Sequence, residues 1–235
     1  MTITRKTFSC GLGLLAAAAL SACGGGGGGG DDPAPAAVYP LQAAYKASVA
    51  RGSSTDYTVS GTCSGSARFT FGAPTRVLWD GANVLAVAET AAINYTNCTP
   101  ASSTTVTQAY YDLNYNPLAT STADGVTGLF RVIGAGLPVS VSVGDTGAFG
   151  SETLYGDSLQ TVIVGRTEIS YLIGPDTATT ALATIISKVY GPTDNLLSTQ
   201  QMRYRMSTDG GFTPDSIDVQ YAPAGTTQLV FTRRP

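Results

Sequence analysis

Few side chains in this sequence could carry out acid–base or metal chemistry, because its 235 residues include no histidine. A Ser-His-Asp triad is therefore impossible, and the commonest metal ligand is missing. A pair of carboxylates could still catalyse hydrolysis, since such pairs form in space rather than in sequence. The only glutamates are Glu89, Glu152 and Glu168, and no spacing marks two of them as partners. We expect them on solvated strand faces or in loops, and the sequence identifies no catalytic residue.

One short segment partly matches a calcium-binding loop. Asp112, Asn114 and Asn116 repeat the spacing with which an EF-hand loop begins. The sixth position is Pro117 where glycine is required, and the twelfth is Ala123 where a glutamate should bind the ion. On a β-strand the first three side chains would simply share one face beside a turn. We therefore predict no metal site and no cofactor.

The first 22 residues have the pattern of a secretory signal. Arg5 and Lys6 precede an apolar run over residues 8–20. This run falls short of the ~20 residues that a membrane-spanning helix needs, and a run of glycines follows at 24–30. We interpret residues 1–22 as a signal peptide, so Cys10 would be lost on cleavage.

The end of this segment points to a lipid anchor. Its residues Leu20-Ser21-Ala22-Cys23 resemble the lipobox of bacterial lipoproteins. The resemblance implies cleavage before Cys23, a diacylglyceryl thioether and acyl chains such as palmitate on this cysteine, and a place in the bacterial cell envelope. Gly24 after the cysteine favours the outer membrane in such proteins. Residues 23–38, rich in glycine, would then form a flexible tether spanning on the order of 20 Å.

Two cysteines remain for the folded part, Cys63 and Cys98. Neither has a CxxC partner or a histidine nearby, which disfavours metal binding and thiol catalysis. In an exported protein such a pair favours a disulfide. Closing a loop of this length should stabilise the fold by roughly 4 kcal/mol.

The net charge of the chain limits the classes of partner that it is expected to bind. Without Arg5 and Lys6, the 13 basic residues fall to 11 against 16 acidic ones, a formal charge of −5. A mildly acidic surface without basic clusters argues against nucleic acid. The predicted partner is thus the membrane, through the lipid anchor, and the sequence points to no particular protein or small molecule.

Residues 39–235 should form one all-β domain. A short helix is expected at about 40–51, where Leu41, Tyr45 and Val49 recur at helical spacing. Beyond it the apolar period changes to two, and turn signals such as Asp80-Gly81 punctuate the runs. This pattern predicts an antiparallel sandwich or curved barrel with one buried face and one short N-terminal helix.

The β domain also contains a weak internal repeat, over residues 55–138 and 139–232. Tyr111 to Asn116 aligns with Tyr190 to Asn195, and Arg131 aligns with Arg205. If the two halves are copies, the paired residues should lie on equivalent strands. The alternative is that short β segments with turns resemble one another by chance.

These features predict a lipid-anchored envelope protein with a structural or binding role and no catalysis. Stretches such as 60–65 and 218–221 resemble those of bacterial lipoproteins, and this resemblance implies no particular activity. Two alternatives stay open: a carrier of an apolar ligand inside a β-barrel, and a carboxylate-based hydrolase. The interior decides between them, because a filled core favours a scaffold, an apolar cavity a carrier, and a cleft with two close acids an enzyme.

Overall fold

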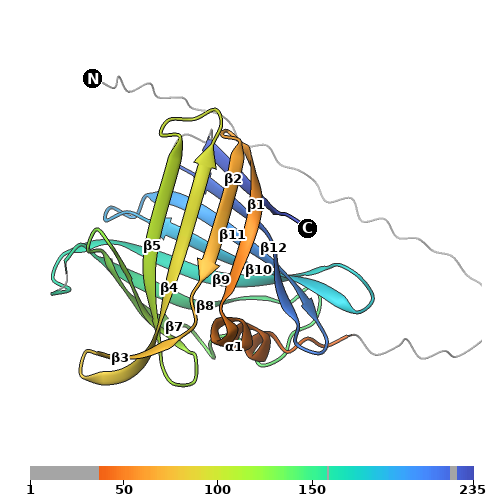
Figure 1. Cartoon of the computed structure of the whole chain (residues 1–235). Helices are drawn as coiled ribbons and strands as arrows, with labels where there is room; N and C mark the ends of the chain where they lie inside the picture. The colour runs from red at the N-terminus through yellow and green to blue at the C-terminus, as the bar shows by residue number, and fades with distance from the viewer. Residues whose placement is uncertain (1–36, 158, 223–226) are drawn as a thin grey trace, which may run out of the picture. The chain divides into compact units, whose positions relative to one another are not determined.

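The computed structural model describes residues 37–157, 159–222 and 227–235, and Figure 1 shows their arrangement. This part of the chain contains one helix followed by thirteen strands. Their bounds are α1 Leu41–Arg51, β1 Ser53–Gly61, β2 Gly65–Phe71, β3 Thr75–Trp79, β4 Ala82–Tyr95, β5 Ser102–Tyr111, β6 Pro117–Thr122, β7 Thr127–Val132, β8 Thr146–Tyr155, β9 Ile163–Pro175, β10 Thr180–Tyr190, β11 Leu196–Ser207, β12 Phe212–Tyr221 and β13 Thr227–Arg233.

Twelve of these strands close into an antiparallel β-barrel. Nearly every strand pairs with its neighbour in sequence, and β13 returns to pair with β1. The ring is completed because β2 pairs with the second half of β4, Phe71 lying opposite Glu89. Strand β3 pairs only with the first half of β4 and extends beyond the ring. The predicted all-β antiparallel fold with one short helix is therefore confirmed, in its curved-barrel form.

The two faces of the barrel wall differ in polarity. Along β1, Tyr57 and Val59 are buried inside the barrel, whereas Asp56 and Thr58, which alternate with them, are exposed on the outside. The same alternation continues in the paired strands, where Phe231 of β13 lies opposite Val59. A sheet with one apolar and one polar face buries the apolar side and leaves the other in water.

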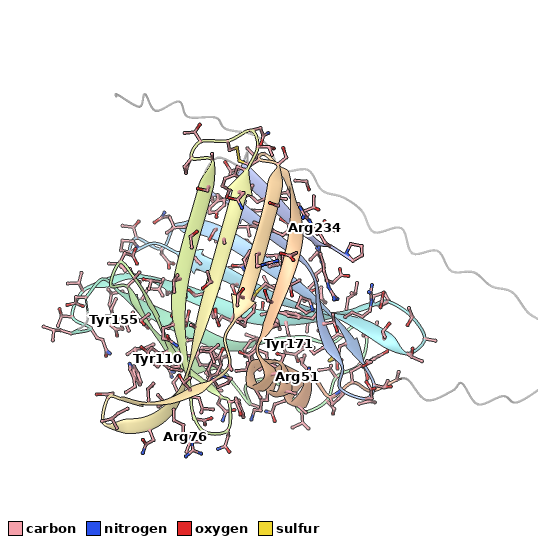
Figure 2. All side chains as sticks on the ribbon, in the orientation of Figure 1. Arg51, Arg76, Tyr110, Tyr155, Tyr171 and Arg234 are labelled. Atoms are coloured by element: carbon pink, nitrogen blue, oxygen red, sulfur yellow. A yellow bond between two sulfur atoms is a disulfide. The ribbon has the colours of Figure 1, made fainter. Side chains whose placement is uncertain are left out.

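Helix α1 crosses one end of the barrel, which we call the helix end (Figure 1). Its start is fixed to the β7–β8 loop, because the backbone N–H of Gln42 donates to the Pro138 carbonyl and its side-chain amide donates to Leu137. Leu41 and Ala44 are fully buried against strands β9 to β12. The other end of α1 reaches Arg51 (Figure 2), and Gly52 then turns the chain into β1 with a φ of 64°.

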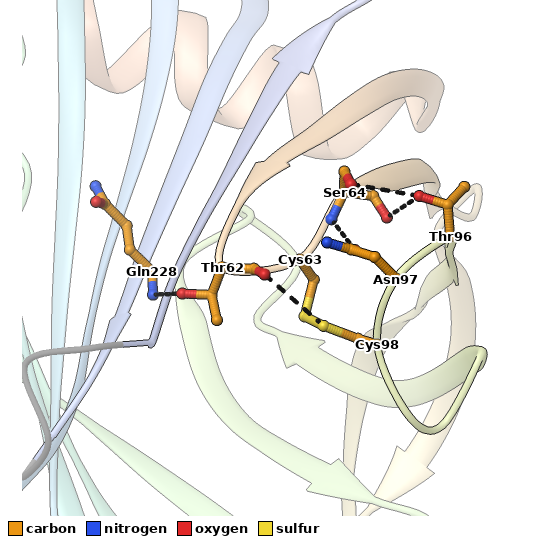
Figure 3. The surroundings of a disulfide bond; sticks show 7 residues. All are labelled: Thr62, Cys63, Ser64, Thr96, Asn97, Cys98 and Gln228. Carbon is orange, nitrogen blue, oxygen red and sulfur yellow. Dashed lines mark hydrogen bonds between the residues drawn. A yellow bond between two sulfur atoms is a disulfide. The ribbon is translucent and has the colours of Figure 1, made fainter.

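A disulfide joins two loops at the opposite end of the barrel (Figure 3). Cys63 lies between β1 and β2 and Cys98 between β4 and β5, with their Cα atoms 5.7 Å apart. The loops meet because β2 and β4 are paired. The backbone N–H of Ser64 also donates to the Asn97 side chain at 2.7 Å. The predicted Cys63–Cys98 bond is thus confirmed.

The residues that the predicted repeat aligns with each other are not separated by a constant number of strands in the barrel. Tyr111 ends β5 and Tyr190 ends β10, five strands further along, whereas Arg131 of β7 and Arg205 of β11 are four strands apart. Tyr111 faces the interior, and Tyr190 lies on the outer face beside Arg166. The strand order therefore lends the duplication no support, and it stays a prediction.

The predicted signal peptide, the predicted lipidation site Cys23 and most of the predicted tether lie outside the described residues. Among the described ones, no helix combines the length and the apolar character that crossing a membrane would require.

Candidate functional site

The interior of the barrel contains a cavity of about 850 Å³. An eight-stranded barrel is just wide enough to be filled by its own side chains, so a ring of twelve strands leaves room to spare. Residues of α1 and of strands β1, β2, β4, β5 and β11 to β13 line this cavity. The opposite part of the interior is filled, because Leu41 and Ala44 of α1 pack there against β9 to β12. The volume lies within the ~300–1,000 Å³ usual for small-molecule sites.

Much of the cavity wall is apolar and aromatic. The rings of Tyr57 and Phe69 pack edge to face with centroids 5.2 Å apart, and those of Phe69 and Phe231 do so at 5.3 Å. Ile217 and Leu229 continue this wall on β12 and β13. Such a surface can bind an apolar molecule by burying its area from water.

A carboxylate, that of Glu89, interrupts this apolar lining. Glu89 lies in the inward-facing series of β4, between Val87 and Ala91, and borders the cavity. Burial first, and then the nearby charge of Glu152, raise its pKa from 4.5 to about 7. Within the described part of the chain, no hydrogen bond or ion pair engages its carboxylate. Its side chain keeps some accessible area because the cavity, and not protein, lies in front of it.

Glu152 is a second interior carboxylate, and it does not line the cavity itself. It belongs to the inward-facing series of β8, opposite Phe130, and accepts a hydrogen bond of 3.3 Å from the Thr120 hydroxyl. Gly128 makes this placement feasible, since a Cβ there would lie 2.6 Å from that hydroxyl and 3.3 Å from the Glu152 carboxylate. Burial raises the pKa of Glu152, and the Thr120 hydrogen bond lowers it in part.

Three tyrosines complete the polar part of the site: Tyr45 of α1, Tyr111 of β5 and Tyr204 of β11. The pKa of Tyr45 is raised to about 12, chiefly by burial; a hydrogen bond with Tyr111 lowers it in part, and the charge of Glu89 raises it. The pKa values of Tyr111 and Tyr204 are raised as well, by burial first and then by neighbouring groups that include Tyr45 and Glu89. All three phenols therefore stay neutral near pH 7 and can act as hydrogen-bond partners and aromatic surfaces.

Arginines border the cavity but leave its carboxylate unpaired. The guanidinium of Arg51 donates to the Ala47 carbonyl at 3.2 Å, and that of Arg233 to the Pro214 carbonyl at 3.5 Å. Both side chains are exposed. Arg203 also lines the cavity, and its guanidinium donates to the side-chain oxygen of Gln201 at 3.3 Å, so none of these arginines is paired with Glu89.

The sequence-based expectation for the glutamates was right for one residue of three. Glu168 lies on the outer face of β9, where its carboxylate pairs with Arg166 at 3.1 Å. The expectation was wrong for Glu89 and Glu152, because each falls in phase with the inward-facing residues of its strand. For Glu89 a signal existed: it stands at the centre of the alternating apolar series from Leu85 to Ile93.

The segment that partly matches a calcium loop closes the β5–β6 turn. The Asp112 carboxylate accepts hydrogen bonds from the backbone N–H groups of Asn114 and Asn116, at 2.8 and 2.9 Å, and from the Asn116 amide at 2.7 Å. Its oxygens are thus used by the turn itself. In the described ranges no three His, Cys, Asp or Glu side chains are grouped so as to hold a metal ion.

Comparison with known proteins gives no further guide to this site. The chain matches no family model, no curated protein and no solved structure. Its function must therefore be argued from the cavity and the residues around it.

Proposed function

We propose that this protein is a lipid-anchored protein of the bacterial cell envelope that binds an apolar or amphiphilic molecule inside its barrel, without catalysis. The observation that carries the proposal is the interior cavity of about 850 Å³ with its largely apolar wall. A purely structural protein would gain from filling this space, because an empty volume forfeits the packing contacts of all the side chains around it. A ligand would supply those contacts.

The predicted anchor at Cys23 agrees with such a role. A lipid-modified cysteine joined by residues 24–36 would keep the barrel within reach of a bilayer, where apolar and amphiphilic molecules accumulate. The barrel could then exchange its ligand with that membrane. Anchoring and binding are separate parts of the proposal, because the cavity exists whether or not Cys23 carries lipid.

The positions of the two interior carboxylates favour binding over hydrolysis. A carboxylate-based hydrolase needs two acids that both face the substrate, one on each side of the bond to be cleaved. Glu89 borders the cavity, whereas Glu152 is not among the residues that line it and accepts a hydrogen bond from Thr120. We therefore infer that the pair acts on the charge inside the barrel and not on a scissile bond.

Narrowing the cavity tests the proposal directly. Ala91 of β4 borders the cavity, so Ala91→Phe would place a ring in the ligand volume. Ala88 on the same strand is exposed on the outer face, so Ala88→Phe is the matched control. A fluorescent, uncharged apolar probe would be titrated into the full-length protein and both variants, with circular dichroism to verify the fold.

We expect Ala91→Phe to weaken probe binding at least about tenfold, which corresponds to ~1.4 kcal/mol. Ala88→Phe should bind like the unmodified protein. Equal binding by the two folded variants, or no binding by the unmodified protein, would contradict a ligand site in the barrel.

A further inference from the structure

The free carboxylate of Glu89 restricts what the cavity can hold. A carboxylate removed from bulk water is stable only when it is neutralised or paired with a positive group. In the part of the chain that the structure describes, Glu89 has no such partner, although it faces a cavity large enough for a ligand. The missing positive charge can therefore come from the molecule that enters the cavity.

We propose that the barrel selects amphiphiles that carry a cationic amine, with the ammonium group held at Glu89 and the apolar chain along the aromatic wall. This inference rests on the ligand-binding function proposed above and names the chemical class of the ligand. The apolar part would lie against Phe69 and Phe231, and the cation would lie beside it at Glu89 of β4, the strand with which the Phe69 strand is paired.

The charges around Glu89 favour a cation. Glu152 adds a second negative charge to the interior, which acts on Glu89 and on Tyr45. The three arginines that line the cavity do not neutralise this charge: Arg51 and Arg233 donate to backbone carbonyls, and Arg203 donates to the side-chain oxygen of Gln201. An anionic head group placed at Glu89 would instead meet two like charges in a medium of low dielectric constant.

The tyrosines near Glu89 favour an ammonium group in particular. Tyr45, Tyr111 and Tyr204 border the cavity, and the charge of Glu89 acts on all three. Aromatic faces attract ammonium ions through their quadrupoles, and the attraction is stronger when the ion is desolvated. A carboxylate among neutral aromatic rings is thus a suitable site for a substituted ammonium.

Binding of a cation should be coupled to loss of a proton from Glu89. With a pKa of about 7, Glu89 must be ionised to pair with the ligand, so acid opposes binding. The groups that face it are Glu152 from β8, Tyr45 from α1, Tyr111 from β5 and Tyr204 from β11. The phenols stay neutral over the range of interest, and Glu152 changes affinity in the same direction as Glu89.

Three probes with the same twelve-carbon chain separate charge from apolar binding: dodecyltrimethylammonium, dodecanol and dodecanoate. Each would be titrated below its micelle concentration into the full-length protein at pH 8.5 and pH 5.5, with calorimetry or displacement of an uncharged fluorophore as readout. Glu89→Gln removes the charge at nearly constant shape, and Glu89→Asp retains it. Glu168→Gln makes the same chemical change on the outer face and serves as the control.

At pH 8.5 we expect dodecyltrimethylammonium to bind the unmodified protein more tightly than dodecanol and dodecanoate. Glu89→Gln should weaken ammonium binding by about 10- to 100-fold, as loss of a charge-assisted contact does, and change dodecanol binding by less than about threefold. Glu89→Asp should keep the preference for the ammonium probe, and Glu168→Gln should behave like the unmodified protein. Lowering the pH to 5.5 should weaken ammonium binding by roughly 30-fold and leave dodecanol binding unchanged.

The outcomes separate the two proposals. If dodecanol fails to bind at either pH, the ligand-binding function itself is wrong. If dodecanol binds but the ammonium probe gains nothing from Glu89, the cavity exists and its selectivity for amines is refuted. Preferential binding of dodecanoate would also refute it, and would assign the head-group site to the arginines at the cavity edge.

Discussion

Replacing Glu89 with glutamine should stabilise the protein, and should do so only at neutral and alkaline pH. The carboxyl has an ordinary pKa of 4.5 in the unfolded chain and of about 7 in the barrel, because burial and then Glu152 disfavour its charge. Between these two values the folded protein binds more protons than the unfolded one. The contribution of Glu89 to stability is therefore most favourable below pH 4.5 and is lost as the pH rises through 7. Glutamine cannot ionise, so the variant does not lose this stability as the pH rises.

The size of the effect follows from the difference between the two pKa values. A difference of about 2.5 units corresponds to roughly 3 kcal/mol at ~1.36 kcal/mol per unit. This is an upper value, since water that enters the cavity screens the charge. Because the whole stability of a domain is only about 5–15 kcal/mol, even half of this effect is measurable.

Urea unfolding at pH 4.5 and pH 8, with the disulfide kept oxidised, measures this effect. The chain contains no histidine, so no ordinary side chain titrates near pH 7 and obscures the change. Glu152→Gln should show a similar trend because burial also raises the pKa of Glu152. If Glu89→Gln is no more stabilising at pH 8 than at pH 4.5, the carboxylate is not buried as described.

Two further predictions concern the anchor and the disulfide. Cys23→Ala should release the protein into the soluble fraction or leave its signal uncleaved, as membrane fractionation with mass spectrometry would show; a mature variant still bound to the membrane would contradict lipidation there. Replacing Cys63 and Cys98 together with serine should lower the free energy of unfolding by up to roughly 4 kcal/mol, because the bond closes a loop with a separation of 35 residues. An unchanged urea midpoint would show that the loops are held by other contacts.

The class of the fold could be predicted because its signals are local. The alternation of Tyr57 and Val59 with polar residues gives one buried and one exposed face to β1, and similar alternations mark the later strands. The helix at 41–51 likewise follows from the spacing of Leu41, Tyr45 and Val49. The disulfide could be predicted from the export that residues 1–23 indicate and from the exclusion of Cys10 and Cys23, neither of which needs tertiary information.

Closure of the ring and the interior charges depend on tertiary information. Strand β2 pairs with β4 and not with β3, which follows it in sequence, and no local pattern predicts that a short strand will lie outside the ring. The inward orientation of Glu152 could not be predicted for a similar reason. Register shifts on either side of it in β8 interrupt the alternation of inward-facing and outward-facing residues. Only Glu89 carried a readable signal, since it replaces an apolar residue in a regular series.

The resemblance between the two halves has a local cause in at least one place. The backbone N–H of Asp112 bonds to the Asn116 carbonyl, and that of Gly191 bonds in the same way to Asn195. Tyr115 and Asp194 occupy the same position in these turns, with φ values of 61° and 64°. Two turns with the same conformation favour similar residues. This part of the sequence match is therefore explained by turn geometry, whether or not the two halves have a common origin.

The stability that the protein loses when Glu89 ionises inside the barrel gives the strongest reason to expect a charged ligand in the cavity. An apolar residue in its place would extend the wall formed by Val87 and Ala91 and would not oppose folding above pH 7. This loss of stability is reversed only when a positive group pairs with the carboxylate. The ion pair then replaces the hydration that the carboxylate has in the unfolded chain. A bound ammonium should therefore stabilise the unmodified protein at pH 8 by more than it stabilises Glu89→Gln, whereas an uncharged ligand should stabilise both equally.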